Sequence, residues 1–109
     1  MNKIYLSILA ILGIALLSAR AEEAKTNFET KCAVCHGKDG KGETKAGQKS
    51  GVRDFTDPKV QETMKDETMF KAVKEGLKKG ETVKMRPYAD KLSDEEIKGL
   101  VKYVRSLKK

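Results

Sequence analysis

The sequence has little of the material that usually builds the core of a small protein. It contains no tryptophan, only three phenylalanines and three tyrosines in 109 residues, and 36% of its residues are charged. A domain of this size buries little apolar surface and usually needs disulfides, a metal or a cofactor for stability. Its two cysteines allow one disulfide at most. We therefore expect a single domain that completes its core with a bound apolar group.

The chain is also poor in metal-binding side chains, with two cysteines and one histidine. A structural zinc site usually takes four such ligands, so these three residues are too few to form a structural zinc site. Cys32 and Cys35 are separated by two residues, and His36 follows directly. A thioredoxin-like dithiol belongs beside a βαβ unit, and no strand pattern of useful length is present. A plain disulfide would leave the small core unexplained.

Cys32, Cys35 and His36 form the Cys-x-x-Cys-His signature of c-type haem attachment. Residues three and four apart share one face of a helix, so both sulfurs can reach the two vinyl groups along one haem edge. His36 can then ligate the iron. The motif predicts one haem c, bound covalently through Cys32 and Cys35. A secreted thiol oxidoreductase without haem is the alternative for the same cysteines.

Long apolar stretches are absent except at the N-terminus. A positive start at Met1–Lys3 precedes the apolar run Ile4–Leu17, and the small residues Ala19 and Ala21 follow. These are the three parts of a secretory signal peptide, with cleavage expected after Ala21. The apolar run is shorter than the about 20 residues of a spanning helix. We therefore expect export to the periplasm and no stable membrane insertion after cleavage.

The chain thus divides into a signal peptide over 1–21 and one domain over 22–109. The full chain has a formal net charge of +7, and residues 1–21 hold two basic and no acidic residues, which leaves +5 on the domain. A secreted protein rarely meets nucleic acid, so we expect no nucleic-acid partner. Opposite fields speed encounter, and an acidic protein surface is the expected partner of a basic monomer.

Periodicity and capping residues predict a helix at each end of the domain. The first is expected over 22–31, and its apolar face holds Ala24, Phe28 and Cys32. At the start of the last helix, Ser93 and Glu96 form a capping box. A hydrophobic staple joins Leu92 to Ile97 there. The apolar face of this last helix consists of Ile97, Leu100, Val101, Val104 and Leu107.

Two further helices are expected in the middle of the chain, beginning at Asp57-Pro58 and at Asp66. Gly76 ends the second in a left-handed conformation, with Leu77 packing back on the helix. Its apolar stripe consists of Met69, Phe70, Val73 and Leu77. The glycine-rich stretch 37–51 is expected to be a loop, and 80–90 an irregular segment. The predicted fold class is therefore all-α.

The sixth position of a haem iron would need a second donor, and no second histidine exists. The candidates are Met64, Met69 and Met85, or a lysine. Met64 and Met69 fall in expected helices and are interpreted as core residues. Met85 lies in a non-helical segment just before Pro87, which stiffens the chain. A thioether ligand favours the reduced state, and we predict that His36 and Met85 hold the iron.

Over nearly all of 22–109 the chain resembles a bacterial monohaem class I cytochrome c. The resemblance rests on Phe28 before Cys32, on the motif through Gly37, on Met85-Arg86-Pro87-Tyr88-Ala89, and on the closing helix with Leu100 and Tyr103. It implies a small cytochrome c fold of short helices and loops wrapped around one covalently attached haem. First and last helices would cross, with Phe28 meeting Leu100 and Tyr103, and Ala24 allowing close approach.

The resemblance implies electron transfer rather than enzymatic activity. With both axial positions filled, the protein would be a soluble electron carrier cycling between Fe(II) and Fe(III) and serving redox partners. An open sixth position would instead indicate a haem enzyme or a gas-binding sensor. A basic ring would steer the partner; it consists of Lys38, Lys41, Lys78, Lys79, Lys84 and Arg86. Two features depart from many relatives: Arg86 follows Met85, and the absent tryptophan leaves Tyr88 and Arg53 as candidate propionate partners.

Overall fold

A computed structural model describes residues 3–109, with side chains from residue 8 onward. Met1 and Asn2, the start of the expected signal peptide, lie outside the described residues. The elements in chain order are α1 (Lys3–Asn27), the π-helical turn η1 (Phe28–Cys32), α2 (Ala33–His36), α3 (Lys45–Ser50), α4 (Pro58–Thr63), α5 (Asp66–Glu75), β1 (Leu77–Lys79), β2 (Thr82–Met85) and α6 (Asp94–Ser106). The predominantly helical class is confirmed, with one short hairpin added.

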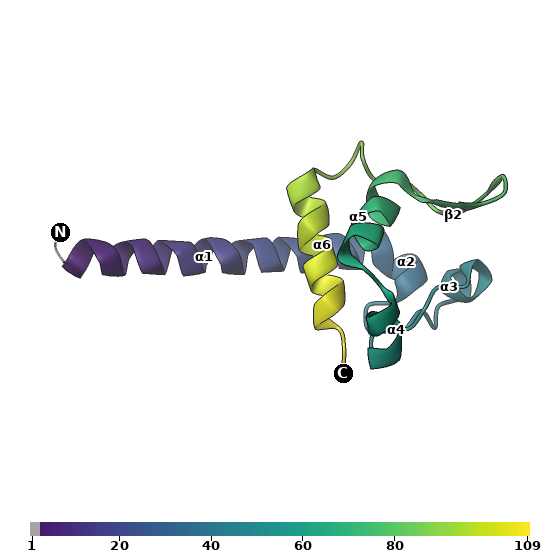
Figure 1. The fold of residues 1–109 in the computed structure, drawn as a ribbon, viewed down its shortest axis with the longest axis horizontal. Helices are drawn as coiled ribbons and strands as arrows, with labels where there is room; N and C mark the ends of the chain where they lie inside the picture. The colour runs from purple at the N-terminus through teal and green to yellow at the C-terminus, as the bar shows by residue number, and fades with distance from the viewer. Residues whose placement is uncertain (1–2) are drawn as a thin grey trace.

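The core lies where α6 crosses the end of α1, as Figure 1 shows. Its buried members are Phe28, Leu92, Ile97 and Leu100. The rings of Phe28 and Tyr103 have centroids 5.1 Å apart. Ala24 is buried opposite Gly99, where a Cβ would lie 3.5 Å from the Ala24 Cβ. The crossing of first and last helices and the contacts of Phe28 are therefore confirmed.

The start of α6 has the predicted capping box. The Ser93 hydroxyl accepts from the Glu96 N–H at 3.1 Å, and the Glu96 carboxylate accepts from the Ser93 N–H at 3.0 Å. These bonds hold the pKa of Glu96 below its usual range. Leu92 and Ile97 are both buried in the core, as the hydrophobic staple requires.

The first helix differs from the one expected over 22–31, because α1 runs without interruption from Lys3 to Asn27 and then continues as η1. Residues 3–27 contain no proline that could interrupt the helix. Its N-terminal part extends away from the other elements in Figure 1, and its apolar side chains between Ile8 and Leu17 are exposed. Within the described residues, no helix has the length and apolar character needed to cross a membrane.

The segment 37–51 was expected to be a loop, and this is wrong for α3. The Thr44 hydroxyl accepts from the Gly47 N–H at 2.9 Å and caps the helix, and Gly51 ends it at a φ of 72°. Such a helix spans fewer than two turns, so it has no periodic pattern to detect. The cap at Thr44 was the available signal.

The segment 80–90 was expected to be irregular, and this is wrong for β2, which pairs with β1 as an antiparallel hairpin. Gly80 supplies the positive φ of 62° that the two-residue turn needs. Gly76 ends α5 with a positive φ as predicted, but its ψ of −178° leads the chain into β1. Leu77 therefore does not pack back on α5 and is 50% exposed.

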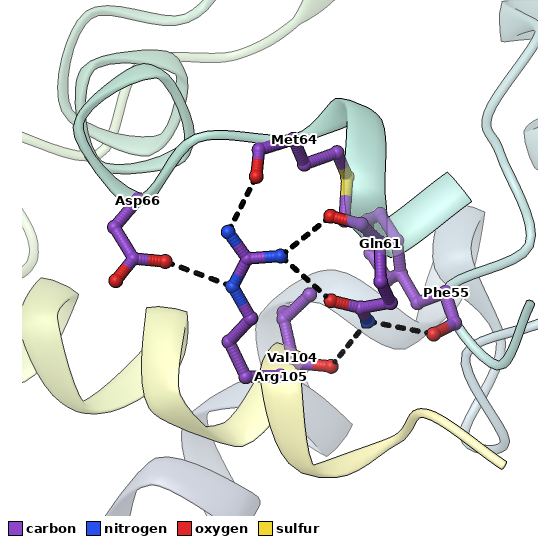
Figure 2. Close-up of polar contacts among 6 residues, drawn as sticks. All are labelled: Phe55, Gln61, Met64, Asp66, Val104 and Arg105. Carbon is purple, nitrogen blue, oxygen red and sulfur yellow. Dashed lines mark hydrogen bonds and ion pairs between the residues drawn. The ribbon is translucent and has the colours of Figure 1, made fainter. Parts of the chain in front are cut away.

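A polar network joins α6 to α4 and α5 (Figure 2). The Arg105 guanidinium donates to the Gln61 carbonyl at 2.8 Å, to the Gln61 side-chain oxygen at 3.0 Å, and to the Met64 carbonyl. It also pairs with Asp66 at 2.8 Å. The buried Gln61 amide donates in turn to the carbonyls of Phe55, at 2.7 Å, and Val104, at 2.9 Å. The predicted start of α4 is confirmed by Asp57, whose side chain caps Pro58–Thr63.

Candidate haem site

The three residues of the Cys-x-x-Cys-His motif lie on consecutive turns at the end of the first helical segment. Cys32 ends η1, and Cys35 and His36 belong to α2. Both cysteines are free, half-buried thiols. Phe28 begins the π-helical turn and is buried in the core, and Cys32 ends the same turn and packs against that core. The structure therefore brings the three predicted attachment residues together.

Burial raises the pKa of the Cys32 thiol to about 11. The thiolate is the reactive form of cysteine, and redox-active dithiols depend on a lowered pKa. Cys32 therefore stays protonated at neutral pH. A raised thiol pKa is the opposite of the lowered pKa that a redox-active dithiol needs.

The His36 side chain lies between aromatic residues. Its ring stacks on Phe55 with centroids 4.7 Å apart and an angle of 21°, and the Phe28 ring is 6.4 Å away. Phe55 is held by its backbone, because its N–H donates to the Gly40 carbonyl at 2.8 Å and its carbonyl accepts from Gln61 at 2.7 Å. These contacts keep water from much of the imidazole.

The buried Nδ1 atom of His36 has no hydrogen-bond partner among the residues that the structure describes. An unsatisfied buried polar atom costs about 1–3 kcal/mol of stability, so an imidazole without a ligand to bind would destabilise the fold at this position. Burial also lowers the pKa of His36, which favours the neutral imidazole that binds metals. A half-buried imidazole with a lowered pKa and, in the described structure, an unpartnered Nδ1 atom, next in the chain to two free thiols, fits a covalently attached haem.

Helix α3 supports the end of α2 through close backbone contact. The Thr44 hydroxyl donates to the Cys35 carbonyl at 2.7 Å, and the Gly42 N–H donates to the His36 carbonyl at 2.8 Å. A Cβ at Gly47 would overlap the Cys35 carbonyl oxygen. Sequence reasoning missed these supporting residues and interpreted their glycines as flexible loop. The Thr44 cap was the only local signal that could have found them.

Met85 ends β2 and is half-buried, paired with Leu77 across the hairpin. Three residues later, the Tyr88 hydroxyl donates to the Lys31 carbonyl at 3.0 Å. Lys31 directly precedes Cys32, so the chain just after Met85 is attached to the helix that carries the motif. Ligation by Met85 stays a prediction.

Of the other candidates, Met69 lies on α5 and is half-buried. Met64 was expected in a helix, and this is wrong, because it follows the end of α4 in an extended conformation. Of the two candidate propionate partners, Arg53 donates to the Thr63 hydroxyl at 3.0 Å and Tyr88 is engaged with Lys31. Arg53 is an exposed surface residue, whereas Tyr88 is half-buried.

The expected basic ring is mostly exposed and includes much of the hairpin. Lys38, Lys78, Lys79 and Arg86 are exposed, whereas Lys41 and Lys84 are half-buried. Apolar side chains are exposed beside them: Val34, between the two cysteines, is 71% exposed, and Val83, on the hairpin, is 52% exposed. Figure 1 shows the hairpin projecting from the body of the molecule.

Comparisons with known proteins identify the chain's family. Residues 19–104 match the family described as cytochrome c oxidase, cbb3-type, subunit III. The solved structure of the KustC0563 c-type cytochrome is similar, with a TM-score of 0.70 and 35% identity over 79% of this chain and 98% of that chain. A tyrosine-to-phenylalanine mutant of KustC0563 is also 35% identical, with a TM-score of 0.68, over 79% of this chain and 99% of its own. No curated protein matches the chain significantly.

Proposed function

Because this chain belongs to the cytochrome c oxidase, cbb3-type, subunit III family and is a monohaem class I c-type cytochrome, we propose that it is a soluble periplasmic electron carrier with His36 and Met85 as axial ligands. The observation that carries the proposal is the buried His36 imidazole, unpartnered at Nδ1 in the described structure, beside the free thiols of Cys32 and Cys35. Residues 1–21 would serve as the signal peptide and 22–109 as the working domain.

Haem c, bound through Cys32 and Cys35, would supply a one-electron couple between ferrous and ferric iron. His36 would be one ligand of the iron, because burial lowers its pKa and so favours the neutral imidazole. Phe55, stacked on that ring, and the buried Phe28 exclude water from it. Met85 would fill the other position, which leaves no place for a substrate. The protein would then be a carrier rather than an enzyme.

The ligand assignment is tested by the visible spectrum of the exported protein and of Met85→Ala. The wild type should show sharp low-spin c-type bands and, when oxidised, the weak red band of a methionine sulfur bound to ferric iron. Met85→Ala should lose the red band, whereas the control Met69→Leu should keep it. A high-spin wild-type protein that readily binds carbon monoxide when reduced would instead indicate a haem enzyme or a gas-binding sensor.

We also propose that the basic ring docks an acidic redox partner. Charge reversal in Lys84→Glu or Arg86→Glu should slow electron exchange with an acidic partner severalfold at low salt, and added salt should remove the difference. The control Lys102→Glu changes the net charge equally but lies on α6, at an exposed position outside the ring. Stopped-flow mixing measures these rates. Equal slowing by all three variants would point to net charge rather than to a docking site.

A further inference from the structure

One side-chain hydrogen bond connects the chain after Met85 to the helix that carries the haem-attachment motif. The Tyr88 hydroxyl donates to the Lys31 carbonyl at 3.0 Å, across 57 positions of sequence. Among the hydrogen bonds of the described residues, no other side-chain bond joins residues 85–92 to η1. The bond reaches the residue directly before Cys32, so it acts on the element that holds the first attachment cysteine.

The backbone of Tyr88 forms its own hydrogen bonds, to α5 and to the residues just before α6. Its N–H donates to the Val73 carbonyl at 2.9 Å, and the Ala89 N–H donates to the Lys74 carbonyl at 3.2 Å. The Tyr88 carbonyl accepts from the Lys91 and Leu92 N–H groups at 3.0 and 2.9 Å. Tyr88 is therefore fixed at its backbone and, through its hydroxyl, on η1.

The Tyr88 ring is held in place by packing. It lies against the core cluster, and this packing directs its hydroxyl to the Lys31 carbonyl. Burial raises the pKa of Tyr88, so the hydroxyl remains a donor at neutral pH. Met85 is only three residues away, and Pro87 restricts the backbone between them. The bond between Tyr88 and Lys31 therefore restricts how far the backbone just after Met85 can move from η1.

We propose that Tyr88 is a positioning residue whose hydroxyl, bonded to the Lys31 carbonyl, holds the Met85 segment against the haem-attachment helix and controls how readily Met85 is displaced from the iron. This inference rests on the proposed ligation by Met85. It assigns to Tyr88 a role that is separate from ligation and from the propionates. The hydrogen bond favours the arrangement in which the Met85 segment lies against the attachment helix. Its loss makes it easier for an added ligand to displace Met85 from the iron.

The test compares the ferric haem-loaded full chain with Tyr88→Phe in a titration with imidazole. Displacement of methionine is followed by the loss of the red band. A net hydrogen bond corresponds to about a three- to tenfold change in an equilibrium constant, so Tyr88→Phe should reach half-displacement at an imidazole concentration lower by about that factor. The ring remains in the core, and far-ultraviolet circular dichroism verifies that the fold is retained.

Tyr103→Phe is the matched control. Tyr103 packs in the same core against Phe28, and its hydroxyl makes no hydrogen bond within the described structure. Its imidazole titration should coincide with that of the wild type. Equal midpoints for Tyr88→Phe and wild type, with the red band present in both, would overturn the role of Tyr88 and leave the ligation by Met85 intact. A wild-type ferric protein without the red band would overturn both.

Discussion

Two glycines show how strongly packing differs between single positions of this chain. Gly47 has no positive φ, but it lies in α3 so close to α2 that a Cβ would overlap the Cys35 carbonyl oxygen. Gly99 lies inside α6, where a Cβ would make an ordinary contact of 3.5 Å with Ala24. The first glycine is required by close approach, whereas the second only lowers the stability of its helix.

We therefore expect opposite effects from the same substitution at these two positions. Gly47→Ala should lower the free energy of unfolding by about 1–3 kcal/mol, because the backbone of α2 must shift to admit the methyl group. Gly99→Ala should raise it by up to about 1 kcal/mol, because alanine is the better helix former. Urea unfolding of the two variants measures both values. Equal destabilisation by both would contradict the contact assigned to Gly47.

At the same scale, the candidate site could be predicted only where its residues are neighbours in sequence. Cys32, Cys35 and His36 form a local motif, so their grouping followed from spacing alone. The bond between Tyr88 and Lys31 spans 57 positions, and nothing in the local sequence at either end indicates it. The stacking of Phe55 on His36 depends on how the loops fold back and was likewise beyond prediction.

Among the elements, the longer helices with an apolar period were predicted, as was α4 from its cap, whereas α3 and the hairpin were missed, α3 despite its cap at Thr44. The capping box at Ser93 and the cap at Asp57 act within one turn of their helices, so the starts of α6 and α4 were confirmed. Helix α3 and the β1–β2 hairpin are short, and neither shows a period. The continuation of α1 through the expected cleavage site also has no local signal at residue 22.

Arg105 makes several hydrogen bonds that join α6 to the junction of α4 and α5. Arg105→Met should lower the free energy of unfolding by about 2 kcal/mol or more, because it leaves the buried Gln61 side-chain oxygen and nearby carbonyls without their donor. Lys102→Met, which replaces an exposed cation on the same helix, should change it by less than about 0.5 kcal/mol. Thermal and urea unfolding measure the difference. Similar values for the two variants would show that the network contributes little.

At the scale of the whole molecule, the N-terminal part of α1 stands apart from the rest. The extents of 60 × 31 × 23 Å reflect the projection of this helix beyond the core (Figure 1). Residues Ile8 to Glu23 are exposed, and burial begins at Ala24. Between the leader (residues 1–21) and α6, Arg20 pairs with Glu95 at 3.9 Å, with both side chains largely exposed. Surface pairs of this kind contribute about 0–1 kcal/mol.

The proposed division at residue 21 therefore predicts that the leader adds little to stability. The holoprotein over 22–109 should unfold within about 1 kcal/mol of the full chain, because the removed segment contributes only an exposed ion pair and exposed apolar side chains. A chain over 28–109, which also loses the buried Ala24 and Asn27, should be clearly less stable. Urea unfolding followed through the haem absorbance compares the three chains. A large loss in the 22–109 chain would show that the leader belongs to the folded domain rather than to a removable signal.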